Sequence, residues 1–228
     1  MRNIAYLVGI VLAIGAGATF AFRESYAGHW TFLVWYGAPT IAVALLGLAR
    51  AHADGVLREW ITPRFGDFTR GFVACGGLFV AAWLFTRLLA PPASPRAAWL
   101  ARLYMQLGDP STRRQNLAYV IAAIIVLAIA EEIVWRGLVI ALLEELIGSR
   151  RAWVWAAVLY SLTHLPAAFV LREPLLGPNP IPAAAALAAG LLWGAMRRKF
   201  ERLAPGIFSH WLFDWAVTLM FPLWGYGI

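Results

Sequence analysis

Charged residues are scarce in this sequence, and their scarcity argues against an ordinary soluble domain. Only 14% of the residues are Asp, Glu, Lys or Arg, whereas 61% are hydrophobic. Soluble globular domains carry about 25% charged residues. Because a membrane-spanning helix needs about 20 predominantly apolar residues, the 228 residues leave room for several spans and no separate soluble domain. The composition therefore indicates an integral membrane protein.

Cysteine is almost absent as well. The single Cys75 lies in an apolar run, so no disulfide can form within the chain and no polar neighbour activates the thiol. Two local signatures of hydrolases are also missing, the His-Glu-x-x-His pair of many zinc enzymes and the Gly-x-Ser-x-Gly turn of serine hydrolases. The sequence therefore gives no support for a cysteine or serine hydrolase, and it lacks the usual local signature of a zinc enzyme.

Basic residues are present in excess, 19 against 12 acidic ones, and give a formal net charge of +7. All of them except Lys199 are arginines, and most fall between the apolar runs. In that position basic residues set the topology of a membrane protein and touch anionic headgroups. We therefore expect the lipid bilayer as a partner and no binding of nucleic acid.

The apolar runs predict an all-α fold, a polytopic transmembrane helical bundle of about seven spans with one short amphipathic helix on the membrane surface. The first run is too long for the core of a signal peptide, so we expect it to be retained. The fourth is about 50 Å long as a helix, against about 30 Å for the bilayer core, and must tilt or protrude. The predicted spans are residues 4–22, 30–49, 71–90, 115–147, 152–170, 183–196 and 205–222, and the amphipathic helix is 96–108.

The distribution of basic residues predicts the orientation. If all seven runs cross the membrane, eleven basic residues lie on one side and six on the other. Cytoplasmic loops carry the excess of Lys and Arg, so we expect the N-terminus in the cytoplasm; the low acidic content and the Arg- and Ala-rich composition suit a bacterial inner membrane. The eleven are Arg2, Arg50, Arg58, Arg64, Arg70, Arg150, Arg151, Arg197, Arg198, Lys199 and Arg202, and the six are Arg23, Arg96, Arg102, Arg113, Arg114 and Arg172.

Two adjacent carboxylates and an arginine interrupt the fourth run. Charge inside a bilayer is costly, so such a cluster marks a functional site. Glu132 and Arg136 are four residues apart, which places them on one helical face as an ion pair. Glu131 is rotated by about 100° and points elsewhere. Glu132 and Arg136 could form a purely structural ion pair, and this remains an alternative. Such a pair would not explain the presence of a second carboxylate, Glu131, in the apolar run.

Histidines on two later spans complete a polar constellation. His164 lies in the fifth span, and His210 and Asp214 lie four residues apart on the seventh. Polar residues on three spans can meet only inside the bundle. A carboxylate beside a neutral histidine can activate water, and a second histidine with an acid or amide can donate to an oxyanion. Alternatively, Glu131, His164 and His210 or Asp214 form a zinc set with an open position for water.

These residues resemble the motifs of the CPBP family of intramembrane proteases, which includes the CAAX prenyl endoproteases and the bacterial Abi-type proteins. The resemblance covers residues 115–222. It divides the chain into residues 1–114, with three spans and the amphipathic segment, and residues 115–228, a catalytic helical core. The motifs are, in chain order, Glu131-Glu132-x-x-x-Arg136, Tyr160-x-x-x-His164 and His210-x-x-x-Asp214.

The resemblance implies a role for each site residue. Glu131 would be the general base that activates water, and His164 would assist it. Glu132 and Arg136 would hold the first motif in place. The family has been described both as metal-dependent and as glutamate-type, so zinc held by Glu131, His164 and His210 stays an alternative.

The resemblance also implies that His210 and Asp214 stabilise the tetrahedral intermediate, and here the sequence departs from the family. Asp214 stands where eukaryotic members have Asn, and an ionised Asp is a poor donor to an oxyanion. Asp214 is therefore protonated, orients His210, or binds metal. Tyr160 stands where Phe is usual, which is a mild change.

The leading hypothesis is an intramembrane endopeptidase that acts on a membrane-anchored protein or peptide. It would process C-terminal segments in the manner of a CAAX protease or of a sorting protease that removes membrane anchors. One rival is an ion- or proton-coupled transporter, which predicts inverted repeats or half-helices that the sequence does not show. The other is a non-catalytic membrane scaffold or immunity protein, in which Glu131 would be replaceable.

Overall fold

The computed structural model describes residues 2–92 and 94–223, and this part of the chain is helical and contains no strand, which confirms the predicted all-α class. Three short elements are not α-helices: η1 is a 3-10 turn, and η2 and η3 are π-helical. In chain order the elements are α1 (Arg2–Ala21), η1 (Glu24–Tyr26), α2 (Thr31–Ala53), α3 (Leu57–Ile61), α4 (Asp67–Leu88), α5 (Ala97–Gln106), α6 (Pro110–Gln115), α7 (Leu117–Glu132), η2 (Ile133–Val139), α8 (Ile140–Ile147), α9 (Ser149–Thr163), α10 (Leu165–Val170), α11 (Ile181–Phe200), α12 (Ala204–Trp215) and η3 (Ala216–Met220).

Within the described residues, five helical stretches are long and apolar enough to cross a membrane: Arg2–Ala21, Thr31–Ala53, Asp67–Leu88, Leu117–Ile147 and Ser149–Val170. They correspond to the first five predicted spans. The sixth and seventh predicted spans form helices α11 and α12 but are not among the five. Three basic residues occupy the last turn of α11, and α12 has only 12 residues before η3 begins.

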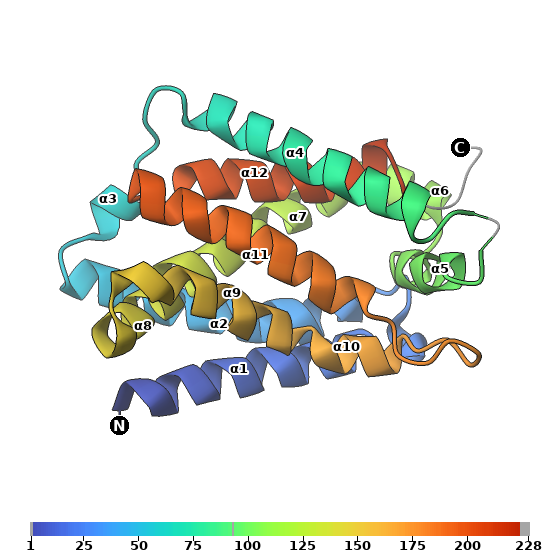
Figure 1. Ribbon diagram of the computed structural model, residues 1–228, viewed down its shortest axis with the longest axis horizontal. Coiled ribbons are helices and arrows are strands. Elements are labelled where there is room, and N and C mark those ends of the chain that lie inside the picture. The colour runs from blue at the N-terminus through green and yellow to red at the C-terminus, as the bar shows by residue number, and fades with distance from the viewer. Residues whose placement is uncertain (1, 93, 224–228) are drawn as a thin grey trace.

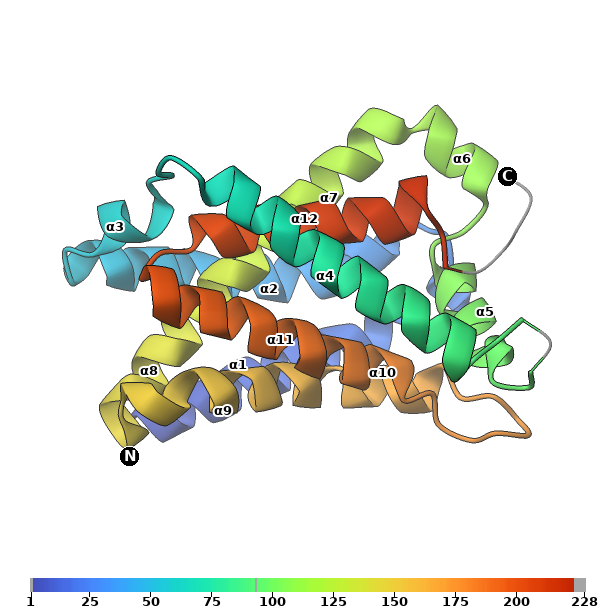
Figure 2. The same ribbon diagram turned by 45° about the horizontal axis from the view of Figure 1, so that its top comes forward.

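Most helices run along the long axis of the molecule and pack side by side (Figure 1). The helix pairs with the most extensive contacts are α9 with α11, α12 with α4, and α1 with α2. Seen from the second direction, α7 and α8 cross the bundle obliquely (Figure 2). Only 11% of the span in α4 is buried within the molecule, so this helix presents most of its apolar surface outward, as a lipid-facing helix does.

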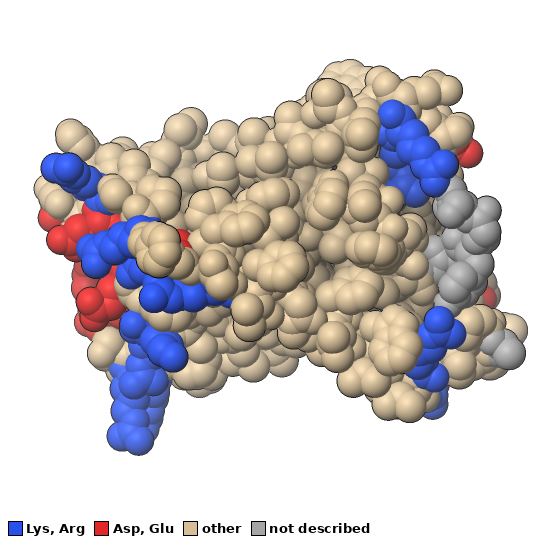
Figure 3. Space-filling model, turned by 90° about the horizontal axis from the view of Figure 1, so that it is seen from above, with Lys and Arg blue, Asp and Glu red and all other residues tan. Residues whose placement is uncertain are grey.

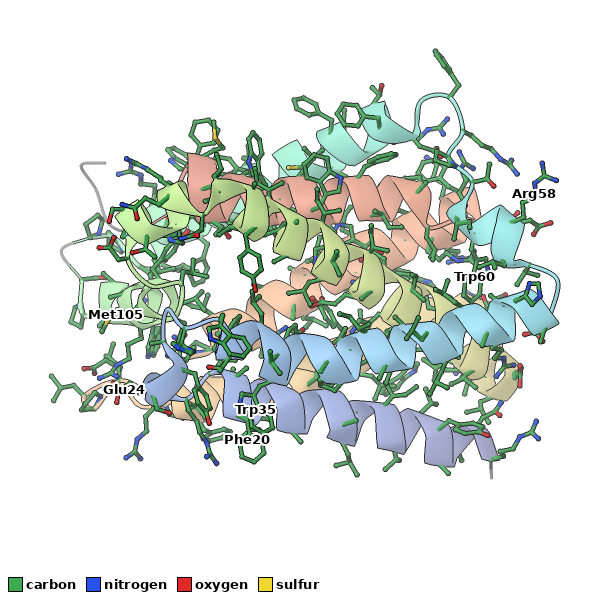
Figure 4. All side chains as sticks on the ribbon, turned by 180° about the vertical axis from the view of Figure 1, so that it is seen from behind. Phe20, Glu24, Trp35, Arg58, Trp60 and Met105 are labelled. Carbon is green, nitrogen blue, oxygen red and sulfur yellow. The ribbon has the colours of Figure 1, made fainter. Side chains whose placement is uncertain are left out.

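Charged side chains gather at the two ends of the molecule, and a broad uncharged belt separates them (Figure 3). This is the pattern of a protein whose middle lies in hydrocarbon and whose ends lie among headgroups and water. Labelled residues identify the two ends: Arg58 and Trp60 lie at one, and Glu24 and Met105 lie at the other (Figure 4).

The long helical stretch Leu117–Ile147 ends where the sequence predicts it. Gly148 has a φ of 78°, a left-handed conformation that favours glycine, and α9 starts at the next residue. The fifth predicted span is broken at His164, which separates α9 from α10, because Pro166 cannot continue the hydrogen bonding of α9.

A buried ion pair fixes the start of α12 against α4. Arg202, just before α12, donates through Nε and Nη2 to the two oxygens of Asp67 at 2.8 and 2.6 Å, and Arg70 donates to the same carboxylate at 3.0 Å. Only 1% of Asp67 is exposed. The bidentate geometry sets the register of α12, and α12 carries the last two predicted site residues.

Candidate active site

The first predicted site segment lies where α7 passes into η2. Glu131 and Glu132 are the last residues of α7, and Arg136 lies inside η2, all seven residues of which are buried. A π-helical turn has i→i+5 bonds and occurs mostly as a short insertion in α-helices, frequently at functional sites. The long apolar helix therefore changes its winding directly after the two carboxylates.

Glu132 is a buried anchor that joins two helices. Its Oε1 lies 3.1 Å from Nη1 of Arg136 and 3.0 Å from Nδ1 of His210 on α12, and only 1% of its side chain is exposed. The guanidinium of Arg136 lies between the rings of Tyr160 and Trp193, 4.8 and 4.9 Å from their centroids. The predicted pair of Glu132 with Arg136 is present, and its contact with His210 extends it to the seventh predicted span.

Gly206 makes room for this anchor. A Cβ atom at position 206 would lie 2.7 Å from Oε2 of Glu132, closer than any such contact allows. The absence of a side chain at the start of α12 therefore lets the carboxylate approach the helix backbone.

Glu131 is held separately, by two phenols. Its Oε1 accepts a hydrogen bond from the hydroxyl of Tyr36 at 2.7 Å, and its Oε2 accepts one from Tyr160 at 2.6 Å. Both contacts are buried, and 6% of Glu131 is exposed. Hydrogen bonds from phenols to a carboxylate are charge-assisted and strong. The two adjacent glutamates thus have different hydrogen-bond partners, as their 100° rotation predicts.

The environment of His164 fixes its tautomer. Its Nδ1 lies 3.0 Å from the carbonyl oxygen of Tyr160, one turn earlier in α9. A carbonyl can only accept, so Nδ1 carries the proton and the Nε2 of a neutral ring is left as an acceptor. Within the described residues His164 makes no hydrogen bond to Glu131, although both side chains line the same cavity.

His210 meets carboxylates through both ring nitrogens. Beside the Glu132 contact at Nδ1, its Nε2 lies 3.7 Å from Oε2 of Glu131 and 3.5 Å from Oδ2 of Asp214. The ring stacks on Trp193 with centroids 3.8 Å apart and planes at 20°. The side chain of Asp214 keeps 39% of its area exposed, because it points into the cavity.

A cavity of about 620 Å³ connects the site to one end of the bundle. Its inner wall carries Glu131, Tyr160, His164, His210 and Asp214. The middle is largely apolar, with lining from α2 and α7, and the outer part is formed by the segment before α2, the end of α5, and α6. The cavity thus reaches the end of the molecule where Glu24 and Met105 lie (Figure 4).

The predicted zinc set does not fit a metal ion in this arrangement. Among the described residues no three of His, Cys, Asp or Glu lie close enough together to hold one. Both oxygens of Glu131 are engaged by phenols, and Nδ1 of His164 faces a carbonyl oxygen. Zinc stays a prediction, which chelation can test.

The structure brings all six predicted site residues into one region and adds two that the sequence did not single out. Tyr36 comes from α2, in the N-terminal spans, and Trp193 comes from α11. A single tyrosine inside an apolar span is only a weak sign of a functional role. Tyr36 could have been taken for an aromatic anchor at the membrane interface, a role that suits its neighbour Trp35. No sequence signal distinguishes Trp193 from a packing residue.

Residues 113–216 match the model of a protein family described as Type II CAAX prenyl endopeptidase Rce1-like. The matched segment contains every predicted site residue. A buried carboxylate beside two histidines, inside an apolar helical bundle, is consistent with an intramembrane protease, and the match indicates this class for the chain.

Residues 113–216 are thus similar to the Rce1-like CAAX endopeptidases, which confirms the resemblance to the CPBP family. No curated protein and no solved structure matched the chain.

Proposed function

We propose that this protein is an intramembrane endopeptidase that hydrolyses a peptide bond of a membrane-associated protein or peptide. The single observation that carries the proposal is the place of Glu131, at the inner end of a cavity that also presents His164 and His210. A structural ion pair needs no cavity, whereas a general base needs access to water and substrate.

The first step is the attack of water on the scissile carbonyl carbon. Glu131 accepts one proton from the water, and Nε2 of His164 accepts a hydrogen bond from its other proton. The new C–O bond forms while the carbonyl π electrons move to oxygen, which becomes an oxyanion. Hydrogen-bond donors aimed at that oxygen lower the barrier. In its imidazolium form His210 carries such a donor on Nε2, which lies 3.7 Å from Oε2 of Glu131.

The second step is the expulsion of the amine. The oxyanion re-forms the carbonyl, the C–N bond breaks, and the proton held by Glu131 passes to the leaving nitrogen. The products are a carboxylic acid, which then loses its proton to solvent and becomes a carboxylate, and an amine. Glu132 and Arg136 act on this reaction indirectly, because they hold His210 and the end of α7. We propose that Asp214 orients His210 from the cavity side.

The orientation of the molecule belongs to the same proposal. The end with α3 and the turn between α8 and α9 carries eleven of the basic residues and faces the cytoplasm. The cavity then opens toward the opposite face of the membrane, which we propose to be a bacterial inner membrane. Substrates would enter from that face, with the cleaved bond near their C-terminal end or their membrane anchor.

The test is cleavage by purified protein in liposomes, with fluorogenic peptides derived from candidate substrates. We expect His164→Ala and His210→Ala to lower the rate by at least about 100-fold, in the range of a lost general acid or base. His52→Ala is the matched control, since His52 is exposed at the end of α2 and outside the cavity. Full activity of both site variants would contradict the proposal.

The same assay tests the metal alternative. Incubation with 1,10-phenanthroline followed by removal of the chelator is expected to leave the rate unchanged if Glu131 acts without metal. A loss of activity that zinc restores would contradict the metal-free mechanism and support the zinc set.

A further inference from the structure

Three cationic side chains surround one aromatic ring at the end of the molecule that carries α3. The ring belongs to Phe200, the last residue of α11. The guanidinium of Arg70 lies 4.7 Å from the ring centroid, the ammonium of Lys199 lies 5.6 Å from it, and the guanidinium of Arg202 lies 5.8 Å from it. We call these three cations the basic cluster. The proposed reaction uses none of them.

A single carboxylate pairs with the basic cluster. Asp67 accepts hydrogen bonds from Arg202 at both of its oxygens and from Arg70 at one of them. Among the described residues Lys199 forms no ion pair, and Glu201 in the adjoining turn pairs with none of the three cations. Three positive charges therefore meet one negative charge, which leaves an excess of two.

Two members of the basic cluster are open to an anion. The side chain of Arg70 is 42% exposed, and Lys199 is exposed as well, whereas Arg202 is buried. Cations held against one ring repel each other, and a bound anion removes that repulsion. A guanidinium binds phosphate oxygens through its fork of donors and an ammonium binds them as a point charge. Arg70 and Lys199 together therefore suit a phosphate group.

The basic cluster lies at the boundary between the charged end of the molecule and its uncharged belt (Figure 3). Arg70 is in the first turn of α4, and Lys199 is in the last turn of α11. Two nearby aromatic residues, Phe65 and Phe68, are exposed. Exposed aromatic rings are typical of the headgroup level of a bilayer. An anion bound to the cluster would therefore lie at the depth of lipid phosphates.

The outward face of α4 continues from Arg70 as an apolar stripe. Val73, Gly77 and Leu84 follow this arginine by three, seven and fourteen positions, a spacing that places them on one side of the helix. Val73 is 68% exposed and Leu84 is 43% exposed. A Cβ atom at Gly77 would meet nothing within 4 Å. Acyl chains attached to a phosphate at Arg70 can therefore lie along this stripe.

We propose that Arg70 and Lys199 bind the phosphate of an anionic phospholipid of the phosphatidylglycerol type, with its acyl chains on the outward face of α4. Basic pockets between transmembrane helices on the cytoplasmic side bind such headgroups, and this end of the molecule carries the larger number of basic residues. The site lies outside the cavity and does not depend on the proposed endopeptidase function. It adjoins the ion pair that fixes the start of α12, because Arg70 and Arg202 share Asp67.

The experiment measures lipid binding to the purified full-length protein in detergent by native mass spectrometry. Phosphatidylglycerol is titrated against zwitterionic phosphatidylcholine with the same acyl chains, and we expect wild type to bind phosphatidylglycerol more tightly. Lys199→Gln should weaken its binding about fivefold, the effect of one basic residue near anionic lipid, and leave phosphatidylcholine binding unchanged. Arg151→Gln is the matched control, since Arg151 is exposed on α9 and removes the same charge away from Phe200.

The double variant Lys199→Gln with Arg70→Gln should lose the preference for phosphatidylglycerol, while Arg202 still holds Asp67. If the double variant does not fold, Lys199→Gln alone decides, because this exposed side chain makes no hydrogen bond within the described residues. A wild type without preference, or a preference that Lys199→Gln leaves unchanged, overturns the proposal. Glycerol 3-phosphate, a headgroup without acyl chains, should not displace the lipid at equal concentration. Full displacement would assign the basic cluster to a soluble anion and overturn the lipid site.

Discussion

Glu131 is fixed by hydrogen bonds from opposite halves of the chain. Tyr36 belongs to the N-terminal spans and Tyr160 to the second predicted motif, and each donates to one carboxylate oxygen. A general base must be held in place to act on water. The two phenols give Glu131 that orientation while its edge still faces the cavity, so the N-terminal spans contribute directly to the site.

Removing the phenols one at a time tests this arrangement. Tyr36→Phe keeps the ring but removes the donor, and we expect kcat to fall about tenfold with little change in KM, since a hydrogen bond to a charged group contributes about 1.5–3 kcal/mol. Tyr160→Phe should have a similar or smaller effect, because phenylalanine is usual at this position in the family. The measurement is steady-state cleavage in liposomes.

The double variant distinguishes orientation from packing. With both donors gone, a buried carboxylate loses all its phenol partners, and the loss should exceed the product of the single effects, as coupled neighbours do. Tyr6→Phe is the control, because Tyr6 is exposed on α1. Strictly multiplicative losses, or full activity of the double variant, would contradict a shared role on Glu131.

The sequence alone indicated which polar residues come together better than it indicated their individual partners. The pairing of Glu132 with Arg136 could be predicted from their spacing, because residues four positions apart lie on the same face of a helix. The contact of Glu132 with His210 and the phenol bond from Tyr36 depend on how distant helices pack. Nothing in the local sequence encodes either, so they emerge only with the fold.

At the scale of elements, the π-helical turn η2 is the feature that shapes the site. It is buried along its length, and Gly137 within it lies against α3. A Cβ at Gly137 would lie 2.5 Å from the ring of Trp60, a rigid group that cannot move aside easily. The glycine therefore allows α3 to pack on the turn that carries Arg136.

Gly137→Ala is expected to destabilise the protein by about 1–3 kcal/mol, the usual cost of overpacking. Thermal unfolding in detergent, followed by circular dichroism, measures it. Gly77→Ala is the matched control, because a Cβ there meets nothing within 4 Å and the helix α4 should tolerate or favour alanine. Equal melting temperatures for the two variants would show that the turn does not need its glycine.

Helix positions were predictable where apolar runs were long and bounded by breakers. The end of the stretch Leu117–Ile147 at Gly148 follows from the glycine. The break at His164 was not predicted, because residues 152–170 were expected to form one uninterrupted span. The change to π-helical winding in η2 was not predicted from the sequence, and the turn packs most extensively against α2, which is distant in the chain. The short helix α3 lies in a segment that the sequence marks only as polar.

At the scale of the whole molecule, the charged residues lie at the two ends of the bundle. One end carries more basic residues than the other, and this difference predicts the orientation in the membrane. Thr62 and Gln115 are exposed and lie at opposite ends of the bundle. In a Cys75→Ser background, we expect Thr62→Cys to react with a membrane-impermeant maleimide only after the cells are opened. Gln115→Cys should react in intact cells. The reverse pattern would place the cavity mouth in the cytoplasm.

Glu131 carries the proposed chemistry, and its removal is the most direct test. The measurement is the single-turnover rate of peptide cleavage by Glu131→Gln, compared with wild type and with Glu144→Gln, which changes an exposed glutamate of α8 outside the cavity. We predict a loss of at least about 100-fold for Glu131→Gln and an unchanged rate for Glu144→Gln. A folded Glu131→Gln protein that cleaves within a few-fold of wild type would contradict the account.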